Sequence, residues 1–155
     1  MTNVVVTGSF DDFRAADMRF LHEASKLGAL HVLLWSDAVT EALEGAAPKF
    51  QLAERQYYLQ AVNYVSNLIV IEELGSASVL PYVAGMRPDI WAVDGRGDMA
   101  PRRQYCAGHG IAYRVVGEDD LAGFPVPDEN AYEQPTDRKK VIVTGCFDWF
   151  HSGHV

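Results

Sequence analysis

Two histidines near the end of the chain have the spacing of a phosphate-binding pair. His151 and His154 follow the apolar run Val141 to Thr144 and the glycine at position 145. If a helix begins there, residues three apart lie on one face at its N-terminus, where the helix dipole favours an anion. Two imidazoles at that position can donate hydrogen bonds to a phosphoryl group that gains charge in a transition state. The pattern therefore predicts catalytic roles for both histidines.

Two other interpretations of this pair stay open. The spacing His-x-x-His also suits a metal ion, but no further histidine or carboxylate is placed to complete such a site. The two side chains can also simply be exposed, although the ordered Gly-Cys-Phe-Asp before them argues against this. We therefore expect phosphate chemistry and no metal held by the histidines.

The strand and turn before these histidines occur twice in the chain. Residues 5–13 read VVTGSFDDF and residues 142–150 read IVTGCFDWF, with an offset of 137 residues. This offset is about one domain length, which favours a tandem duplication. The copies then diverge, because the first continues with Arg14 and Asp17 where the second has its histidines.

The second copy resembles the signature of the cytidylyltransferase-like nucleotidyltransferases, and the duplication is similar to that of the tandem-domain ethanolamine-phosphate cytidylyltransferases. In this family an alcohol phosphate attacks the α-phosphate of a nucleoside triphosphate, pyrophosphate leaves, and Mg²⁺ assists. The resemblance implies that His151 and His154 stabilise the transition state, with CTP or ATP as the nucleotide. It also implies nucleotide contacts from Gly145, Cys146, Phe147, Asp148 and Gly153.

The first copy is similar to the same family over residues 1 to about 116, although more weakly. Its Gly-Ser-Phe-Asp turn, the Ser-Asp after a second apolar run, a Pro-Lys loop, a following arginine and a late Asp-Gly correspond to family motifs. By this resemblance the expected nucleotide-binding residues are Gly8, Ser9, Phe10, Asp11, Arg14, Asp17, Ser36, Asp37, Lys49, Arg55, Asp94 and Gly95.

The departures from the family pattern fall on the catalytic positions of this first copy. Arg14 and Asp17 replace the two histidines, and Ala16 replaces the glycine between them. Glu44 stands where the family often has a lysine that binds the triphosphate, and Asp94 stands where another lysine is expected. Negative charge at these places opposes triphosphate binding. We expect the first copy to keep the fold and to lose catalysis, while Arg14 keeps ligand binding open.

Apolar runs alternate with helical patterns from the N-terminus to about residue 116. The predicted strands cover residues 4–7, 30–35, 68–71, 89–93 and 111–116, and the predicted helices cover 17–27, 52–65, 77–84 and 101–109. Such alternation is typical of an α/β fold, a Rossmann-like open parallel sheet with helices on both faces. The ligand pocket of such a sheet lies at the carboxyl ends of its strands, here beside Gly8, Ser36 and Asp94.

Composition narrows the classes of function. The 155 residues carry a net charge of −8, which gives no basic excess for general nucleic-acid binding. Two cysteines are too few for a disulfide framework and favour the cytoplasm. The N-terminus has no cationic stretch followed by a long apolar run, and no run of about 18 apolar residues occurs, so we expect neither a signal peptide nor membrane insertion.

The expected domain organisation follows from these patterns. Residues 1–120 form a degenerate nucleotidyltransferase-like domain, 121–139 a linker rich in proline and polar residues, and 140–155 the opening of a truncated second domain. We expect a homodimer that transfers a nucleoside monophosphate from CTP or ATP to a small alcohol phosphate, with activity in the second domain. The alternative is a catalytically inactive nucleotide-binding or dimerisation module.

Overall fold

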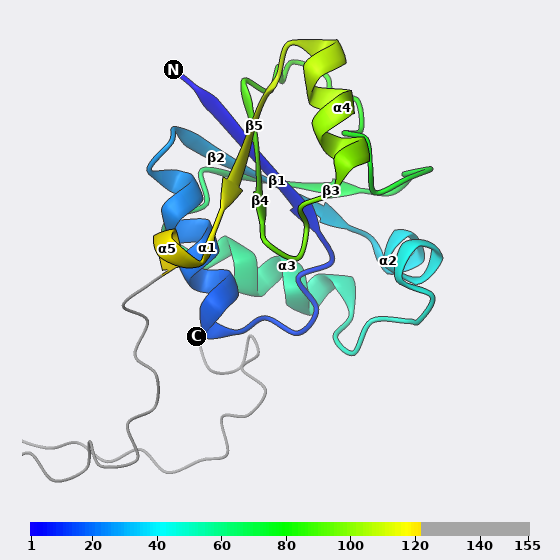
Figure 1. The fold of residues 1–155 in the computed structure, drawn as a ribbon. Coiled ribbons are helices and arrows are strands. Elements are labelled where there is room, and N and C mark those ends of the chain that lie inside the picture. Colours follow the sequence, from blue (N-terminus) through cyan, green and yellow to red (C-terminus); the bar gives the residue numbers. More distant parts are fainter. Residues whose placement is uncertain (122–155) are drawn as a thin grey trace, which may run out of the picture.

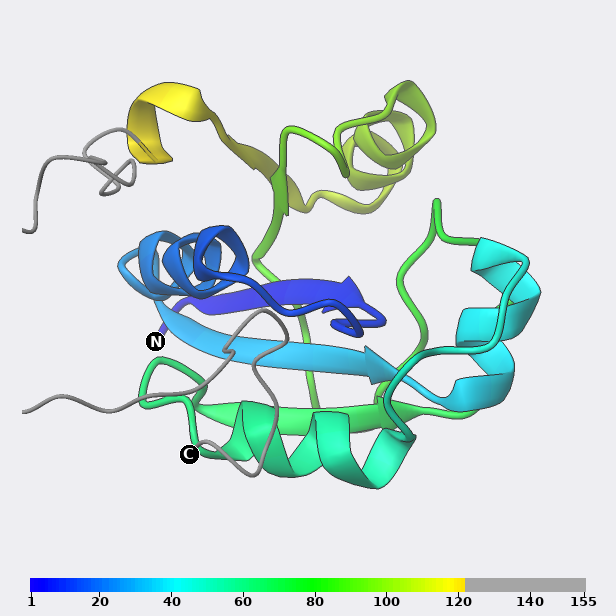
Figure 2. The same cartoon turned by 90° about the horizontal axis from the view of Figure 1, so that it is seen from below.

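The computed structural model describes residues 1–121, and the expected linker and second copy lie outside the described residues. Five strands form one parallel sheet in the order β3-β2-β1-β4-β5. They are β1 (Asn3–Gly8), β2 (Ala29–Trp35), β3 (Asn67–Ile71), β4 (Ile90–Asp94) and β5 (Ala112–Val116). In Figure 2 the arrowheads of β1 and β2 point the same way, toward α2. The predicted fold class, a Rossmann-like α/β sheet, is confirmed.

Helices cover both faces of the sheet (Figure 1). They are α1 (Ala15–Ser25), α2 (Asp37–Glu44), α3 (Leu52–Gln60), α4 (Ala100–His109) and α5 (Glu118–Leu121). Buried side chains of α1 and α3 pack in one apolar cluster with β1 and β2, and Leu121 at the end of α5 packs against that cluster. Side chains of α2 and α4 pack in a second cluster on the other face.

Strand β1 shows why a short apolar run makes a central strand. Val4 and Val6 belong to the α1–α3 cluster, whereas Val5 belongs to the opposite cluster, and all three are buried. Successive side chains of a strand point to opposite faces, so a strand covered by helices on both sides must be apolar throughout. The burial of three consecutive valines therefore fixes β1 in the middle of the sheet.

The segment 77–84 is not helical, and the prediction of a helix there was wrong. Pro81 lacks a backbone N–H and disfavours helical geometry at the residue before it. Instead, the carbonyl of Ala77 accepts a hydrogen bond from Arg102 Nε at 2.8 Å, and Leu80 is buried in the second cluster. The segment is an irregular stretch attached to α4 by side-chain contacts.

The structure differs from the predicted elements in two further ways. One predicted helix is shorter than expected, and short helices occur that were not predicted. The helix predicted for 52–65 ends at Gln60, and a turn closed by Val65 N–H to Val62 O leads into β3. The short helix α2 was not predicted, although Ser36 caps its N-terminus and Gly45 ends it at φ 79°. Gly110 ends α4 at φ 66°, as predicted.

Candidate functional site

A cavity of about 540 Å³ opens at the carboxyl ends of β1 and β4. The two strands pair at Val4 with Ile90 and at Val5 with Trp91, and the last residues of both strands line the cavity. The chain leaves β1 for α1 on one face of the sheet and leaves β4 for α4 on the other face, and open α/β sheets hold ligands where neighbouring strands diverge in this way. The lining comprises Thr7, Gly8, Ser9, Phe10, Asp11, Asp12, Asp17, Phe20, Trp35, Glu44, Lys49, Ala92, Val93, Asp94, Arg96, Gly97 and Arg102.

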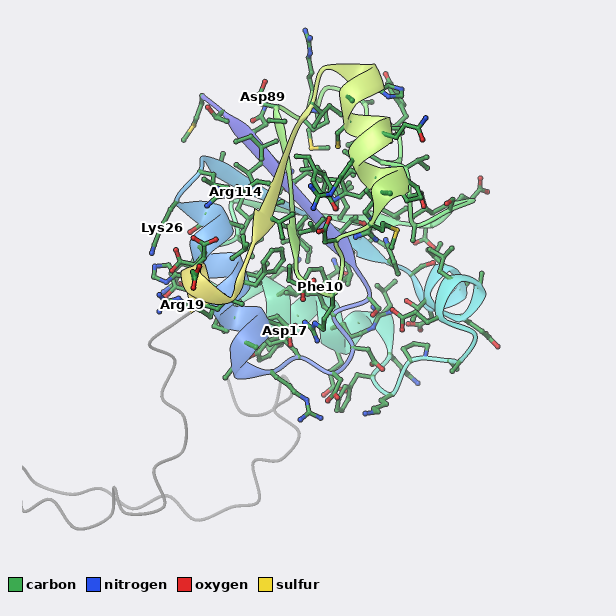
Figure 3. The ribbon with its side chains drawn as sticks, in the orientation of Figure 1. Phe10, Asp17, Arg19, Lys26, Asp89 and Arg114 are labelled. Carbon is green, nitrogen blue, oxygen red and sulfur yellow. The ribbon has the colours of Figure 1, made fainter. Side chains whose placement is uncertain are left out.

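The loop after β1 and the first turn of α1 form one wall of this cavity. Figure 3 shows Phe10 and Asp17 near the same end of the domain, with Asp89 at the opposite end. Phe10 adopts φ 50°, a left-handed conformation that is uncommon outside glycine and recurs at binding sites. Arg14 is the N-cap of α1, and its backbone N–H donates to the Asp17 carboxylate at 2.8 Å. The carboxylate of Asp17 therefore occupies the end of α1 where an anion would otherwise bind.

Arg96 joins this wall to the loop after β4. Its Nη2 donates to Asp17 Oδ1 at 2.5 Å, and its Nε donates to Asp94 Oδ2 at 2.7 Å. The hydrogen bond to Asp94 raises the pKa of Arg96 above its usual value, and the hydrogen bond to Asp17 adds to this effect. The cation and the two anions neutralise much of each other's charge at the mouth of the cavity.

Two further carboxylates come from the loop between β1 and α1. Asp11 accepts backbone N–H groups from Lys49 at 2.7 Å and Phe50 at 2.8 Å, so it ties this loop to the one before α3. Arg14 donates two hydrogen bonds to Asp12 and, with Lys49, lowers the pKa of that carboxyl. The lowered pKa keeps the Asp12 carboxylate ionised at neutral pH.

The structure brings seven of the predicted nucleotide-binding residues together in the cavity lining. They are Gly8, Ser9, Phe10, Asp11, Asp17, Lys49 and Asp94. Five others, Arg14, Ser36, Asp37, Arg55 and Gly95, are not part of the lining. The predicted residues of the second copy, His151, His154, Gly145, Cys146, Phe147, Asp148 and Gly153, lie outside the described residues.

Arg55 lies next to the cavity, not in its lining. Its guanidinium is buried and donates to the carbonyls of Ser9, Trp35 and Phe50 and to the carboxylate of Asp37. These contacts tie the ends of β1 and β2 to the start of α3. Ser36, the third residue of the predicted pocket edge, is buried and accepts from the Val39 N–H as the cap of α2.

Several residues of the lining were not predicted from the sequence, among them Trp35, Arg96, Gly97 and Arg102. Arg96 and Gly97 follow β4 directly, and this position at a strand end is the signal that could have found them. Trp35 donates its indole N–H to the Thr7 hydroxyl at 2.7 Å. Arg102 reaches the cavity from α4, and its sequence neighbourhood gives no signal for this.

The described residues do not form a site for the Mg²⁺ that the family resemblance implies. No group of three histidines, cysteines or carboxylates suited to a metal ion occurs within residues 1–121. Asp17 and Asp94 share Arg96, and Asp11 is engaged by backbone N–H groups. Among the described residues, the cavity lining also holds no histidine or cysteine that could act as a base or nucleophile.

Comparisons with known proteins bear on the fold. No protein-family model matches the chain, and no curated protein matches it. Among solved structures, it is similar to the crystal structure of the lipopolysaccharide core biosynthesis protein from Thermoplasma volcanium GSS1. The match has 24% identity and a TM-score of 0.57, and it covers 76% of this chain and 95% of that one. This likeness shows a shared fold. No helix in residues 1–121 is long and apolar enough to cross a membrane.

Proposed function

We propose that the protein is a nucleotidyltransferase of the cytidylyltransferase-like type whose residues 1–121 are a non-catalytic domain. Catalysis belongs to the second copy of the motif, with His151 and His154, in a longer protein. The repeat within the sequence and the shared α/β fold support this assignment. In this proposal the protein acts in the cytoplasm as a homodimer, without nucleic acid and without membrane insertion.

The single observation that carries the proposal is the contact between Asp17 and the N-terminus of α1. A helix N-terminus binds phosphate because its first N–H groups have no partners within the helix. Here the Asp17 carboxylate accepts the Arg14 N–H, and its second oxygen accepts from Arg96. A nucleotide phosphate would have to displace the Asp17 side chain from this position.

Transfer of a nucleotidyl group needs positive charge where the first domain has negative charge. In the proposed reaction an oxygen of the alcohol phosphate attacks the α-phosphorus of CTP or ATP. The bond from that phosphorus to the β-phosphate oxygen breaks, and pyrophosphate leaves. Donors aimed at the α-phosphate stabilise the charge that builds on its oxygens, and loss of one donor commonly costs about 10²- to 10³-fold in rate. Asp17 at the second histidine position is an acceptor and cannot supply such a donor.

Mg²⁺ is part of this proposal only as the companion of the nucleotide. It would neutralise phosphate charge during the transfer. Because the described residues hold no cluster suited to the ion, its protein contacts would have to come from the second copy.

The alternative function is that of an inactive module that binds a nucleotide or holds two protomers together. The cavity between β1 and β4 favours nucleotide binding by such a module, because it is open to a ligand although Arg14 and Asp17 replace the two histidines.

The test compares variants of the longer protein in a pyrophosphate-release assay with CTP or ATP and a panel of alcohol phosphates. We expect His151→Ala and His154→Ala each to lower the rate at least 100-fold. The matched variants Arg14→Ala and Asp17→Asn, at the corresponding positions of the first copy, should lower it less than threefold. A loss of activity in the first-copy pair with retention in the histidine pair would overturn the proposal.

A further inference from the structure

We propose that Arg102, the loop at Gly97 and the first turn of α4 form a binding subsite for a single phosphate group of a small phosphate monoester. The subsite lies on the β4 side of the cavity, away from the acidic wall at α1. This inference concerns ligand binding by residues 1–121 and does not depend on catalysis by the second copy.

Arg102 is a buried cation at the edge of the cavity. The residue is 6% exposed, and its guanidinium carbon lies 5.2 Å from the ring centre of Trp91. It is nevertheless part of the cavity lining. Burial lowers the pKa of Arg102, which reflects how much hydration the charged group has lost.

The partners of Arg102 within the described residues are neutral. Its Nε donates to the Ala77 carbonyl at 2.8 Å, and its Nη1 donates to the Gly97 carbonyl at 2.9 Å. Within residues 1–121, Nη2 has no hydrogen-bond partner, and no carboxylate oxygen lies within 4.0 Å of the group. Arg55 is the instructive contrast, since it is equally buried and has the Asp37 carboxylate at 2.6 Å. Buried charges in proteins are as a rule paired, so Arg102 is suited to pair with the anionic group of a bound ligand.

The first turn of α4 adds a second reason to expect an anion here. It contains no acidic residue, its N-cap Met99 offers no capping side chain, and it carries Arg102 and Arg103. Positive side chains at a helix N-terminus are unfavourable, because the dipole already places positive charge there. Asp98 compensates Arg103 through two hydrogen bonds, whereas the described residues give Arg102 no such partner.

The backbone at Gly97 leaves the space in which Arg102 is held. A Cβ atom at this position would lie 2.9 Å from Arg102 Nη1 and 3.2 Å from Asp94 Oδ1. The Gly97 N–H donates to Asp94 Oδ1 at 2.8 Å, while Arg96 holds the other oxygen of that carboxylate. Asp94 is thus engaged by its own loop: its charge raises the pKa of Arg102 somewhat against the effect of burial, but it forms no ion pair within 4.0 Å of Arg102.

The charges across the cavity limit the ligand to one phosphate. Asp12, Asp17 and Glu44 also line the cavity, so a triphosphate that extends from Arg102 through the cavity would meet carboxylates. Aromatic side chains of the lining, Phe10, Phe20 and Trp35, offer contact for a neutral body such as a base or an alkyl group. A nucleoside monophosphate and a small alcohol phosphate both satisfy this description, and the experiment separates them.

The test is calorimetric titration of the 155-residue chain with CMP, AMP, glycerol phosphate and inorganic phosphate. We expect at least one monoester to bind, and Arg102→Met to weaken that binding about 10- to 100-fold, as expected for loss of a charge-assisted contact. The matched variant Arg103→Met removes the neighbouring exposed arginine and should change binding less than threefold. CTP should bind no more tightly than CMP.

A second pair of variants keeps the test valid if Arg102→Met fails to fold. Gly97→Ala places a methyl group against Arg102 and should weaken monoester binding at least tenfold. Gly75→Ala is the control, because a Cβ there meets nothing within 4 Å and Gly75 is not part of the cavity lining. No binding of any probe to the wild-type chain, equal losses in Arg102→Met and Arg103→Met or in the two glycine variants, or tighter binding of CTP than of CMP would overturn the inference. None of these outcomes bears on transfer at His151 and His154, which the assay of the longer protein tests separately.

Discussion

The carboxylate of Asp17 lies 2.8 Å from the backbone nitrogen of Arg14, so α1 closes its own N-terminus. In the second copy of the motif the corresponding positions are the histidines 154 and 151. In the proposed function, aspartate in place of histidine at position 17 exchanges a hydrogen-bond donor toward phosphate for an acceptor that caps the helix itself. Loss of the proposed catalytic pair is therefore compatible with an intact first domain.

The capping contact predicts a measurable loss of stability when it is removed. Asp17→Ala should lower the free energy of unfolding by about 1 kcal/mol, the usual cost of losing a helix-capping side chain. Asp17→Asn keeps an oxygen that can accept the Arg14 N–H and should cost less. Urea denaturation of the two variants measures the difference. Equal stability of Asp17→Ala and the wild type would show that the contact contributes nothing.

Arg55 should behave as a structural residue. Arg55→Met leaves the carbonyls of Ser9, Trp35 and Phe50 without their donor, and we expect a loss of about 3 kcal/mol in the free energy of unfolding. The control Arg103→Met changes an exposed arginine and should cost much less. Thermal and chemical denaturation together measure both. If Arg55→Met has the same free energy of unfolding as the control, the buried contacts of Arg55 do not stabilise the loops after β1 and before α3.

His31 should make the stability depend on pH between 7 and 5. Burial lowers its pKa below the ordinary value of 6.5, and Nδ1 has no hydrogen-bond partner among the described residues. The contribution of His31 is therefore present above pH 6.5 and is lost as the pH falls through its lowered pKa, because protonation then favours the unfolded chain. We expect His31→Gln to flatten the decline in unfolding free energy, whereas His109→Gln at an exposed site leaves it unchanged. An identical decline in both variants would contradict this assignment.

The domain boundary can be tested by truncation. Both apolar clusters and all five strands are complete by Leu121, and the sequence then becomes rich in proline and polar residues. We expect a chain that ends at about residue 135 to melt within about 2 °C of the 155-residue chain, measured where both are monomers. A large drop in melting temperature would place part of residues 136–155 in the core of the first domain.

The strands were predictable from the sequence because local composition determines them. Runs such as Val4 to Val6 are apolar on both faces, and only a central strand between two helical layers accommodates this. The segment around Pro81 misled the helical pattern, because long-range contacts such as Arg102 to Ala77 decide its conformation. Helix α2 has only 8 residues, and so short a helix gives too few apolar positions for its periodicity to be recognised in the sequence.

The site was predictable in its position but not in its charges. Gly8 and Asp94 mark the ends of neighbouring strands, which is enough to place the cavity. The role of Arg96 depends on Asp17, which is distant in sequence, and Arg102 reaches the cavity only through the packing of α4. Such contacts follow from the tertiary fold, and no spacing in the sequence reveals them.

The central claim is that residues 1–121 have the nucleotidyltransferase-like fold without its catalysis. Pyrophosphate release from CTP and from ATP by the 155-residue chain, with Mg²⁺ and alcohol phosphates present, tests this most directly. The account predicts no release above a protein-free control, and no difference between the wild type and Arg14→Ala. Release that is well above the control and is abolished by Arg14→Ala would contradict it.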